Sequence, residues 1–124
     1  MSDSKTTAEA LRGVRKAIES TIRDYRSMPF FVRPMVKRGF TRRTGRSLDD
    51  WLEHIARAIV AIERGDDVPH LGPELARLAD NYRTAPERAK RGMRGQALET
   101  MKRRSLERAE TVEAAIEALG AQSS

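Results

Sequence analysis

The sequence predicts an all-α protein, a single-domain helical bundle of about five helices. Apolar residues recur at spacings of three and four along most of the chain, as they do on the buried face of a helix. Ser or Thr followed three residues later by Glu or Asp precedes several of these stretches, a pattern that caps helix starts. No segment alternates apolar and polar residues as a half-buried strand does. The length of 124 residues fits one domain.

The first helix is predicted at residues 7–26. Thr6 and Glu9 form a capping box at its start. Pro29 ends it, because proline lacks a backbone N–H and restricts the residue before it. Residues 1–5 are predicted to fray. The apolar stripe of this helix consists of Leu11, Val14, Ile18, Ile22 and Tyr25.

A short second helix is predicted at residues 34–44 and a third at residues 48–64. The second begins with a proline, which suits a first helical turn, and stops before Gly45, which suits a C-terminal cap. Ser47 and Asp50 cap the start of the third. The third helix has the most regular apolar face, so it is predicted to be the core helix. That face consists of Leu48, Trp51, Leu52, Ile55, Ala58, Ile59 and Ile62.

A fourth helix is predicted at residues 73–83. It follows residues 66–73, whose two prolines and one glycine mark a loop. Thr84 and Glu87 form a third capping box. The fourth helix is therefore predicted to end before this box, and a new helix to begin at it.

The last helix is predicted at residues 85–119, a length of about 50 Å, with glycines at residues 92–95 that can interrupt it. Residues 120–124 are predicted to fray. Its apolar seam consists of Leu98, Met101, Ser105, Ala109, Val112, Ile116 and Leu119. Such a seam packs either along the bundle or against a second copy of the chain, so a homodimer through the C-terminal helix is one prediction.

An apolar connector, Phe30–Val32, separates the first two helices. The favoured interpretation is that it plugs the end of the bundle. The alternative is an exposed contact with a partner or a membrane, next to a basic helix. Of the two exposed contacts, with a partner or with a membrane, the membrane contact is the less favoured.

Charge is distributed unevenly along the chain. The net charge of +6 conceals two basic blocks, residues 33–46 and residues 81–104, each with a net charge of +6. Residues 47–80 carry a net charge of −5 and residues 105–124 one of −3. A basic balance of this kind favours a polyanionic partner, namely nucleic acid, an anionic membrane or an acidic protein surface.

The first basic block contains six bases and no acid. On a helical wheel, its predicted exposed face consists of Lys37, Arg38, Thr41 and Arg42. Val36 and Phe40 fall on the opposite, core-facing side, and Arg43 lies nearer that side. A helix of this kind can lie in the DNA major groove, where arginines reach phosphates or guanine edges. Arg46 and Ser47 then stand at the start of the next helix, where free N–H groups favour an anion. The alternative is a solvated surface on which the two aspartates after Leu48 neutralise Arg46.

A local pattern resembles the end of the second helix-turn-helix of AraC-type transcription regulators, and it consists of Val36, Arg38, Phe40, Arg42, Arg43, Gly45, Ser47 and Trp51. In that family a basic helix with a central Phe is followed by Gly-x-Ser and by an aromatic residue that packs the next helix. The resemblance implies that the helix around Phe40 touches DNA. It covers about 17 of the 124 residues. Upstream, Pro34 departs from the pattern and the first helix of the pair is missing.

The second basic block supports the first. Local helical pairs are predicted to account for part of its charge, and they are Glu87–Arg91, Glu99–Arg103 and Arg103–Glu107. A solvated face is the favoured interpretation of this block, with its remaining bases in a supporting role.

No catalytic, nucleotide-binding or metal motif is present, and the chain has no cysteine. Asp50 and His54 are one helical turn apart and are interpreted as a surface pair rather than as metal ligands. The sequence therefore predicts a non-enzymatic protein without a cofactor or a metal. The absence of cysteine, of a signal segment and of an apolar run of about 18 residues favours a cytoplasmic protein.

The leading prediction is a small basic helical protein that binds nucleic acid, duplex DNA first of all. The predicted contact residues are Arg33, Lys37, Arg38, Thr41, Arg42, Arg46, Arg88, Lys90 and Arg94. The alternative is a protein–protein interaction or assembly module that uses the long C-terminal helix and docks its basic patch on an acidic partner.

Overall fold

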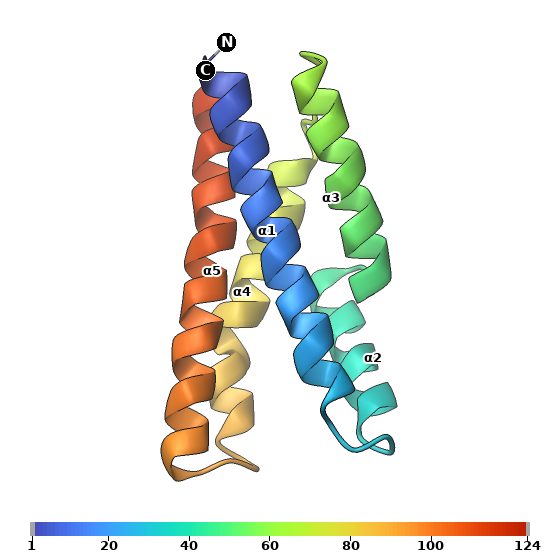
Figure 1. Cartoon of the computed structure of the whole chain (residues 1–124), viewed down its shortest axis with the longest axis vertical. Coiled ribbons are helices and arrows are strands. Elements are labelled where there is room, and N and C mark those ends of the chain that lie inside the picture. The colour runs from blue at the N-terminus through green and yellow to red at the C-terminus, as the bar shows by residue number, and fades with distance from the viewer. Residues whose placement is uncertain (1, 124) are drawn as a thin grey trace.

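The computed structural model of the chain describes residues 2–123, and all of the regular structure in this part of the chain is helical. The helices are α1 (Ser2–Arg26), α2 (Arg33–Thr44), α3 (Leu48–Glu63), α4 (Leu71–Ala89) and α5 (Gly95–Ser123). The predicted all-α bundle of five helices is confirmed (Figure 1). No helix in the described range is long and apolar enough to cross a membrane.

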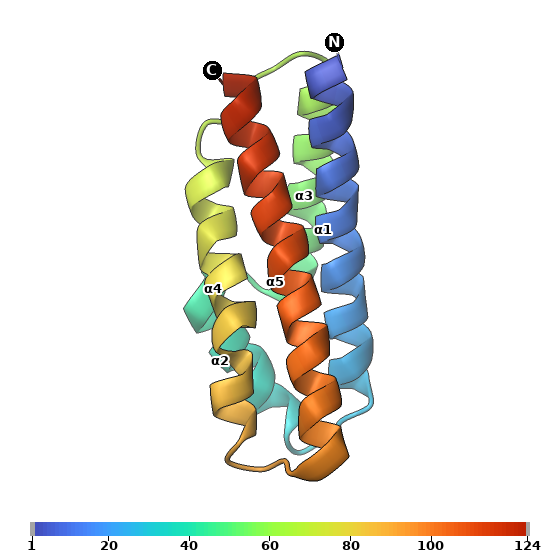
Figure 2. The ribbon, with the colours of Figure 1, turned by 90° about the vertical axis from the view of Figure 1, so that its left-hand side faces the viewer.

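The five helices form four antiparallel legs (Figure 1). The chain descends along α1, returns through α2 and α3 in succession, descends again along α4 and returns along α5. Figure 2 shows α5 between α4 and α1, and α1 also packs against α3, while α2 packs mainly against α4. Both chain ends therefore lie at one end of the bundle, and the α1–α2 and α4–α5 connections lie at the other.

All four legs contribute to one core. The fully buried large side chains include Leu11 of α1, Trp51 of α3 and Leu75 of α4, and Val112 of α5 joins them. As predicted, α3 contributes a long buried face to this core, and it packs mainly against α1. Its buried residues are Leu48, Trp51, Ile55, Ala58, Ile59 and Ile62.

The junction between α2 and α3 agrees with its sequence signals. Gly45 has a φ of 87°, in the left-handed region that glycine enters without strain, and its N–H bonds to the Thr41 carbonyl at 2.7 Å. The Ser47 hydroxyl accepts from the Asp50 N–H at 3.1 Å and caps α3. The buried Trp51 indole donates to the Thr44 hydroxyl at 3.0 Å. This turn therefore fixes where α2 sits on the bundle.

The predicted frayed ends are wrong within the described residues. Helix α1 begins at Ser2 rather than residue 7, so Thr6 lies inside the helix and not at its cap. Thr7 is buried and donates to the Ala118 carbonyl at 3.4 Å, which ties α1 to the last turns of α5. Helix α5 reaches Ser123. Packing between the first and last helices orders both ends, whereas local sequence signals report only on single helices.

The predicted boundary between the last two helices is also wrong. Helix α4 continues through Pro86 to Ala89. Thr84 does not cap a new helix, because its hydroxyl donates back to the Asp80 carbonyl at 2.9 Å within α4. The chain then turns at residues 90–94, and α5 starts at Gly95. The helix predicted at residues 85–119 is therefore interrupted close to its glycines, as the sequence allowed, and its two parts belong to α4 and α5.

The connector between α1 and α2 does not plug the bundle. Phe30 and Phe31 are 79% and 72% exposed, and they stack edge-to-face on each other with ring centroids 5.8 Å apart. The favoured interpretation of Phe30–Val32 is therefore wrong for the two rings. Tyr25 and Phe40 fill the adjacent core position instead, with ring centroids 6.4 Å apart.

Candidate nucleic-acid interface

The bundle topology separates charge along its long axis. Residues 23–46 and 81–104 form the end that carries the two interhelical connections (Figure 1), and we call this the basic end. It contains both basic blocks, each with a net charge of +6. The acidic stretches, residues 47–80 and 105–124, form the rest of the α3, α4 and α5 legs. Two blocks that are distant in the sequence therefore act as one positive surface.

The outer face of α2 is an accessible part of the basic end. Lys37, Arg38 and Arg42 are exposed, as is Thr41, while Phe40 on the opposite side is fully buried. This agrees with the predicted orientation of the helix. Within the described residues, no carboxylate lies within ion-pair distance of the three bases. Their charge is thus available to an external anion.

The same helix is held firmly from behind. Arg43 turns inward, as predicted, and its Nε donates to the Asn81 side-chain oxygen of α4 at 2.7 Å. Arg77 of α4 donates to the Arg42 carbonyl at 3.2 Å. These contacts, with Phe40 in the core, attach α2 to α4 and leave its charged front free.

Arg88 was predicted to contact the ligand, but the structure places it in the seam between α2 and α4. Its guanidinium donates to the Asn81 carbonyl at 2.9 Å, to the Asn81 side-chain oxygen at 3.2 Å and to the Thr84 hydroxyl at 2.7 Å. Burial lowers the pKa of Arg88 and of Arg43, and Arg43 lowers that of Arg88 further. Both remain charged. Arg88 is therefore half-buried and adds positive potential behind α2 rather than a free hydrogen-bonding group.

Arg46 is also engaged inside the protein. Its Nε and terminal nitrogen donate to one Glu74 oxygen at 3.1 and 2.8 Å, and its guanidinium lies 6.0 Å from the centre of the Trp51 ring. His54 bonds to the other Glu74 oxygen at 2.9 Å, so the predicted Asp50–His54 surface pair is replaced by a pair across helices. Burial tends to raise the pKa of Glu74, but the hydrogen bonds from Arg46 and His54 lower it overall. The expected anion position at the start of α3 is occupied by the chain's own groups.

Three predicted contact residues remain, namely Arg33, Lys90 and Arg94, and each has a different environment. Arg33 is half-buried and donates to the Met28 carbonyl at 2.8 Å, so it braces the α1–α2 connection. Lys90 pairs with Glu87 at 3.1 Å, where the sequence predicted a pair of Glu87 with Arg91. Arg94 is exposed in the α4–α5 connection.

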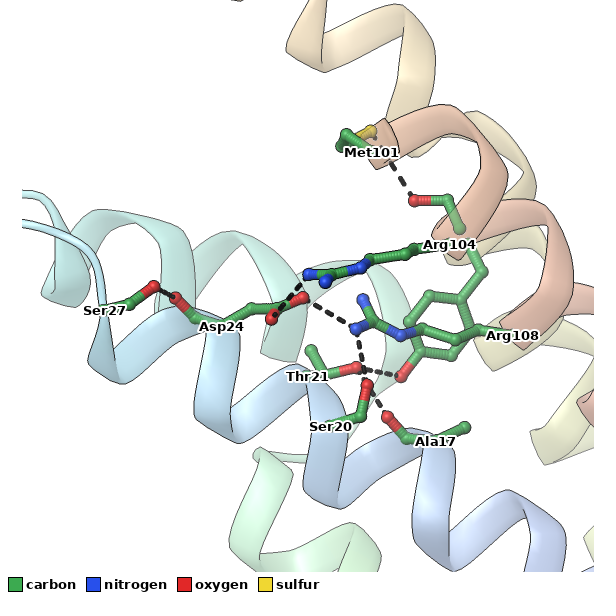
Figure 3. Close-up of polar contacts among 10 residues, drawn as sticks. Ala17, Ser20, Thr21, Asp24, Ser27, Met101, Arg104 and Arg108 are labelled. Atoms are coloured by element: carbon green, nitrogen blue, oxygen red, sulfur yellow. Dashed lines mark hydrogen bonds and ion pairs between the residues drawn. The ribbon is translucent and has the colours of Figure 1, made fainter. Parts of the chain in front are cut away.

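Arg104, at the end of the second block, and the neighbouring Arg108 are paired with α1. Figure 3 shows Arg104 and Arg108 of α5 directed at Asp24 of α1, with distances of 3.6 and 2.7 Å. Arg108 also donates to the Ser20 hydroxyl. Glu99 pairs with Lys102 at 3.5 Å, rather than with Arg103 as predicted. The exposed bases of the basic end that have no ion pair among the described residues therefore include those of α2 and Arg94 of the α4–α5 connection.

The apolar seam of α5 packs inside the bundle. Ser105, Ala109, Val112 and Leu119 are buried against the neighbouring legs. Of the two packing modes open to this seam, the structure shows the one along the bundle. The seam therefore has no exposed apolar stripe for pairing with a second copy.

Sequence reasoning missed two features of this end. Asn81 is only 4% exposed and accepts hydrogen bonds from two arginines, Arg43 and Arg88. The sequence signal that could have identified it is a polar residue next to the apolar face of Leu75, Leu78 and Tyr82. The exposure of Met35 was missed as well. Among the described residues, no three His, Asp or Glu side chains gather in a way that could hold a metal ion.

Comparisons of the chain with protein-family models, curated proteins and solved structures found no match. The local AraC-like pattern therefore stays a resemblance. In the structure, the helix before α2 is the 25-residue α1, which packs lengthwise against α5 and α3 as a leg of the bundle.

Proposed function

We propose that the protein binds nucleic acid, duplex DNA first of all, through the outer face of α2. The observation that carries this proposal is the row of exposed bases, Lys37, Arg38 and Arg42, without a carboxylate partner among the described residues. Lys and Arg at such positions neutralise phosphates. The exposed Thr41 hydroxyl donates to the Lys37 carbonyl at 3.0 Å, so it reaches a phosphate only by exchanging that bond.

The dimensions of α2 suit this role. Its 12 residues span about 18 Å, and the major groove of B-DNA, about 12 Å wide, admits one α-helix. The core side is fixed by Phe40 and Arg43, so the charged face is presented without reorganisation of the fold. Arg94 and the potential of Arg88 support the interface from the neighbouring connection.

The interface is redefined relative to the sequence prediction. Lys37, Arg38, Thr41 and Arg42 remain its centre, with Arg94 at the margin. Arg33, Arg46 and Arg88 support the fold of this end, because they are half-buried and their guanidinium groups bond within the chain, whereas Arg38 is exposed and bonds only at 3.4 Å to the Pro34 carbonyl of its own helix.

The test compares two triple variants of equal net charge. One carries Lys37→Gln, Arg38→Gln and Arg42→Gln, and the matched control neutralises Lys5, Arg57 and Arg64, which are exposed and lie outside the basic end. Binding to a fluorescein-labelled duplex is measured by anisotropy at about 50 mM salt, where loss of three phosphate contacts weakens binding at least roughly 100-fold.

The control should bind as the wild type does, apart from a small effect of its lower net charge. Equal losses in the two variants would show that only total charge matters. If the wild type fails to bind at low salt, the basic face has another partner, and an acidic protein surface becomes the leading alternative.

A further inference from the structure

The tip of the basic end exposes large apolar side chains. Phe30, Phe31 and Met35 are 79%, 72% and 65% exposed, and we call these three residues the apolar foot. The other large apolar residues exposed in the described chain, Val60 and Leu106, are 44% exposed and stand singly. Isolated exposed apolar residues are ordinary, but a cluster of this kind marks an interaction site.

The foot has a defined shape. The N–H groups of Val32 and Arg33 bond to the Pro29 carbonyl at 3.0 and 3.3 Å, and Met35 N–H bonds to the Val32 carbonyl at 3.1 Å. The Arg33 side chain closes the same turn on the Met28 carbonyl. The connection is thus a hydrogen-bonded turn that directs the two phenyl rings outward, where only a contact outside the chain can bury them.

Positive charge surrounds the foot. Residues 25–48 contain no Asp or Glu. Arg26 lies just before the foot, and Lys37 and Arg38 lie one turn beyond it on α2, all three exposed. Apolar side chains flanked by Lys and Arg are the pattern of a segment that enters the boundary between headgroups and acyl chains of an anionic bilayer.

The charge of the whole bundle favours the same approach. The acidic stretches, residues 47–80 and 105–124, lie mainly away from the foot (Figure 1). When the bundle meets an anionic surface end-on, its bases reach the headgroups while most of its carboxylates point away. A bilayer also accepts phenyl rings that carry no hydrogen-bonding group, whereas the phosphates of a duplex offer nothing to bury them.

We propose that the apolar foot docks the basic end on an anionic lipid surface, with Phe30 and Phe31 in the acyl boundary and Arg26, Lys37 and Arg38 at the phosphate level. This goes beyond nucleic-acid binding, because it adds Phe30, Phe31 and Arg26 to the two bases Lys37 and Arg38 that both surfaces use. The foot lies at the N-terminal end of α2, while Thr41 and Arg42 lie toward its C-terminal end. Because Lys37 and Arg38 serve both surfaces, a vesicle and a duplex compete for the protein.

The experiment is co-sedimentation of the full chain with vesicles of phosphatidylcholine alone or mixed with phosphatidylserine. Wild type should bind the mixed vesicles and lose most binding without the anionic lipid, because each base near the surface contributes about fivefold. Phe30→Ser with Phe31→Ser should weaken binding roughly 100-fold or more. The control Val60→Ser with Leu106→Ser removes two exposed apolar residues outside the foot and should bind as the wild type does.

A loss of vesicle binding would not be due to unfolding, because both rings are exposed and the foot variant should keep the wild-type melting temperature. The proposal is overturned if the wild type does not bind anionic vesicles, if it binds neutral vesicles equally well, or if the foot variant binds undiminished. A duplex-binding assay on the same variant separates the two surfaces. Unchanged duplex affinity supports a lipid-specific foot, whereas a loss as large as that for vesicles assigns the foot to the nucleic-acid interface and refutes the lipid proposal.

Discussion

The hydrogen bond between Tyr82 and Thr21 joins α4 to α1 across the middle of the bundle. The two hydroxyl oxygens are 2.7 Å apart, and both side chains are buried. The Thr21 hydroxyl already donates its proton to the Ala17 carbonyl at 2.8 Å (Figure 3), so the Tyr82 hydroxyl is the donor in the bond between them. Because Tyr82 is the donor, removing the Tyr82 hydroxyl and removing the Thr21 hydroxyl should destabilise the protein by different amounts.

Tyr82→Phe removes the donor and leaves Thr21 bonded to Ala17, so it should destabilise the protein by about 1 kcal/mol. Thr21→Val keeps the shape but strands a buried donor on Tyr82, which should cost about 2 kcal/mol. The double variant has no stranded donor, so it should be less destabilised than the sum of the two single variants. Urea unfolding at neutral pH measures all three free energies.

Alkaline pH gives an independent check of the burial of Tyr82. Burial raises the pKa of Tyr82 to about 12, from 10.0. A raised pKa in the folded state means that the stability is fully present below pH 10 and is lost as pH rises toward 12. The loss amounts to about 2.7 kcal/mol.

Tyr82→Phe should lack this component, so the stability difference between wild type and variant should shrink and then reverse across this window. The reasoning is refuted if the variant keeps the full alkaline loss, or if Thr21→Val costs less than Tyr82→Phe.

Two further predictions concern the support of α2, and they use three substitutions, one of them a control at Gly65. Gly45→Ala and Gly65→Ala both place a side chain at positive φ, 87° and 85°, and each should cost about 1 kcal/mol of folding stability. Gly45→Ala should cost more, because its new carbon lies 2.7 Å from the Arg77 guanidinium, while Gly65 faces open space. A larger loss of stability for Gly65→Ala in thermal melts would contradict this. Glu74→Gln should lower the melting temperature at neutral pH by weakening the bonds to Arg46 and His54. The pKa of Glu74 is lowered in the folded protein, so the stability that its carboxylate contributes is present above the ordinary pKa and disappears as pH falls through the folded pKa. The melting temperatures of wild type and variant should therefore converge in acid. A difference in melting temperature that stays constant at all pH values would contradict the assignment.

Sequence signals predicted the parts of the fold that local chemistry decides. The regular face of α3, the Ser47 cap and Gly45 each specify a structure within a few residues, and all three are confirmed. The signal at Thr84 failed because its hydroxyl can bond backward as well as forward. Packing against α5 favours continuation of α4, and Pro86 removes only one N–H from that helix.

The candidate site was predictable only as a helical face. The wheel placed Phe40 inward and Arg43 off the front, because both follow from periodicity. It could not show that Arg46 bonds to Glu74, which is 28 residues away, or that Arg88 reaches Asn81. Such pairings depend on the arrangement of the legs, which no local pattern encodes.

The salt dependence of duplex binding tests the central claim most directly. If Lys37, Arg38 and Arg42 each neutralise one phosphate, a plot of log affinity against log salt concentration has a steeper negative slope for the wild type than for the variant with Gln at all three positions. The two slopes should differ by about 2.7. The control with Lys5, Arg57 and Arg64 neutralised keeps the wild-type slope. Equal slopes for wild type and the α2 variant would contradict the claim that this face of α2 contacts the phosphates.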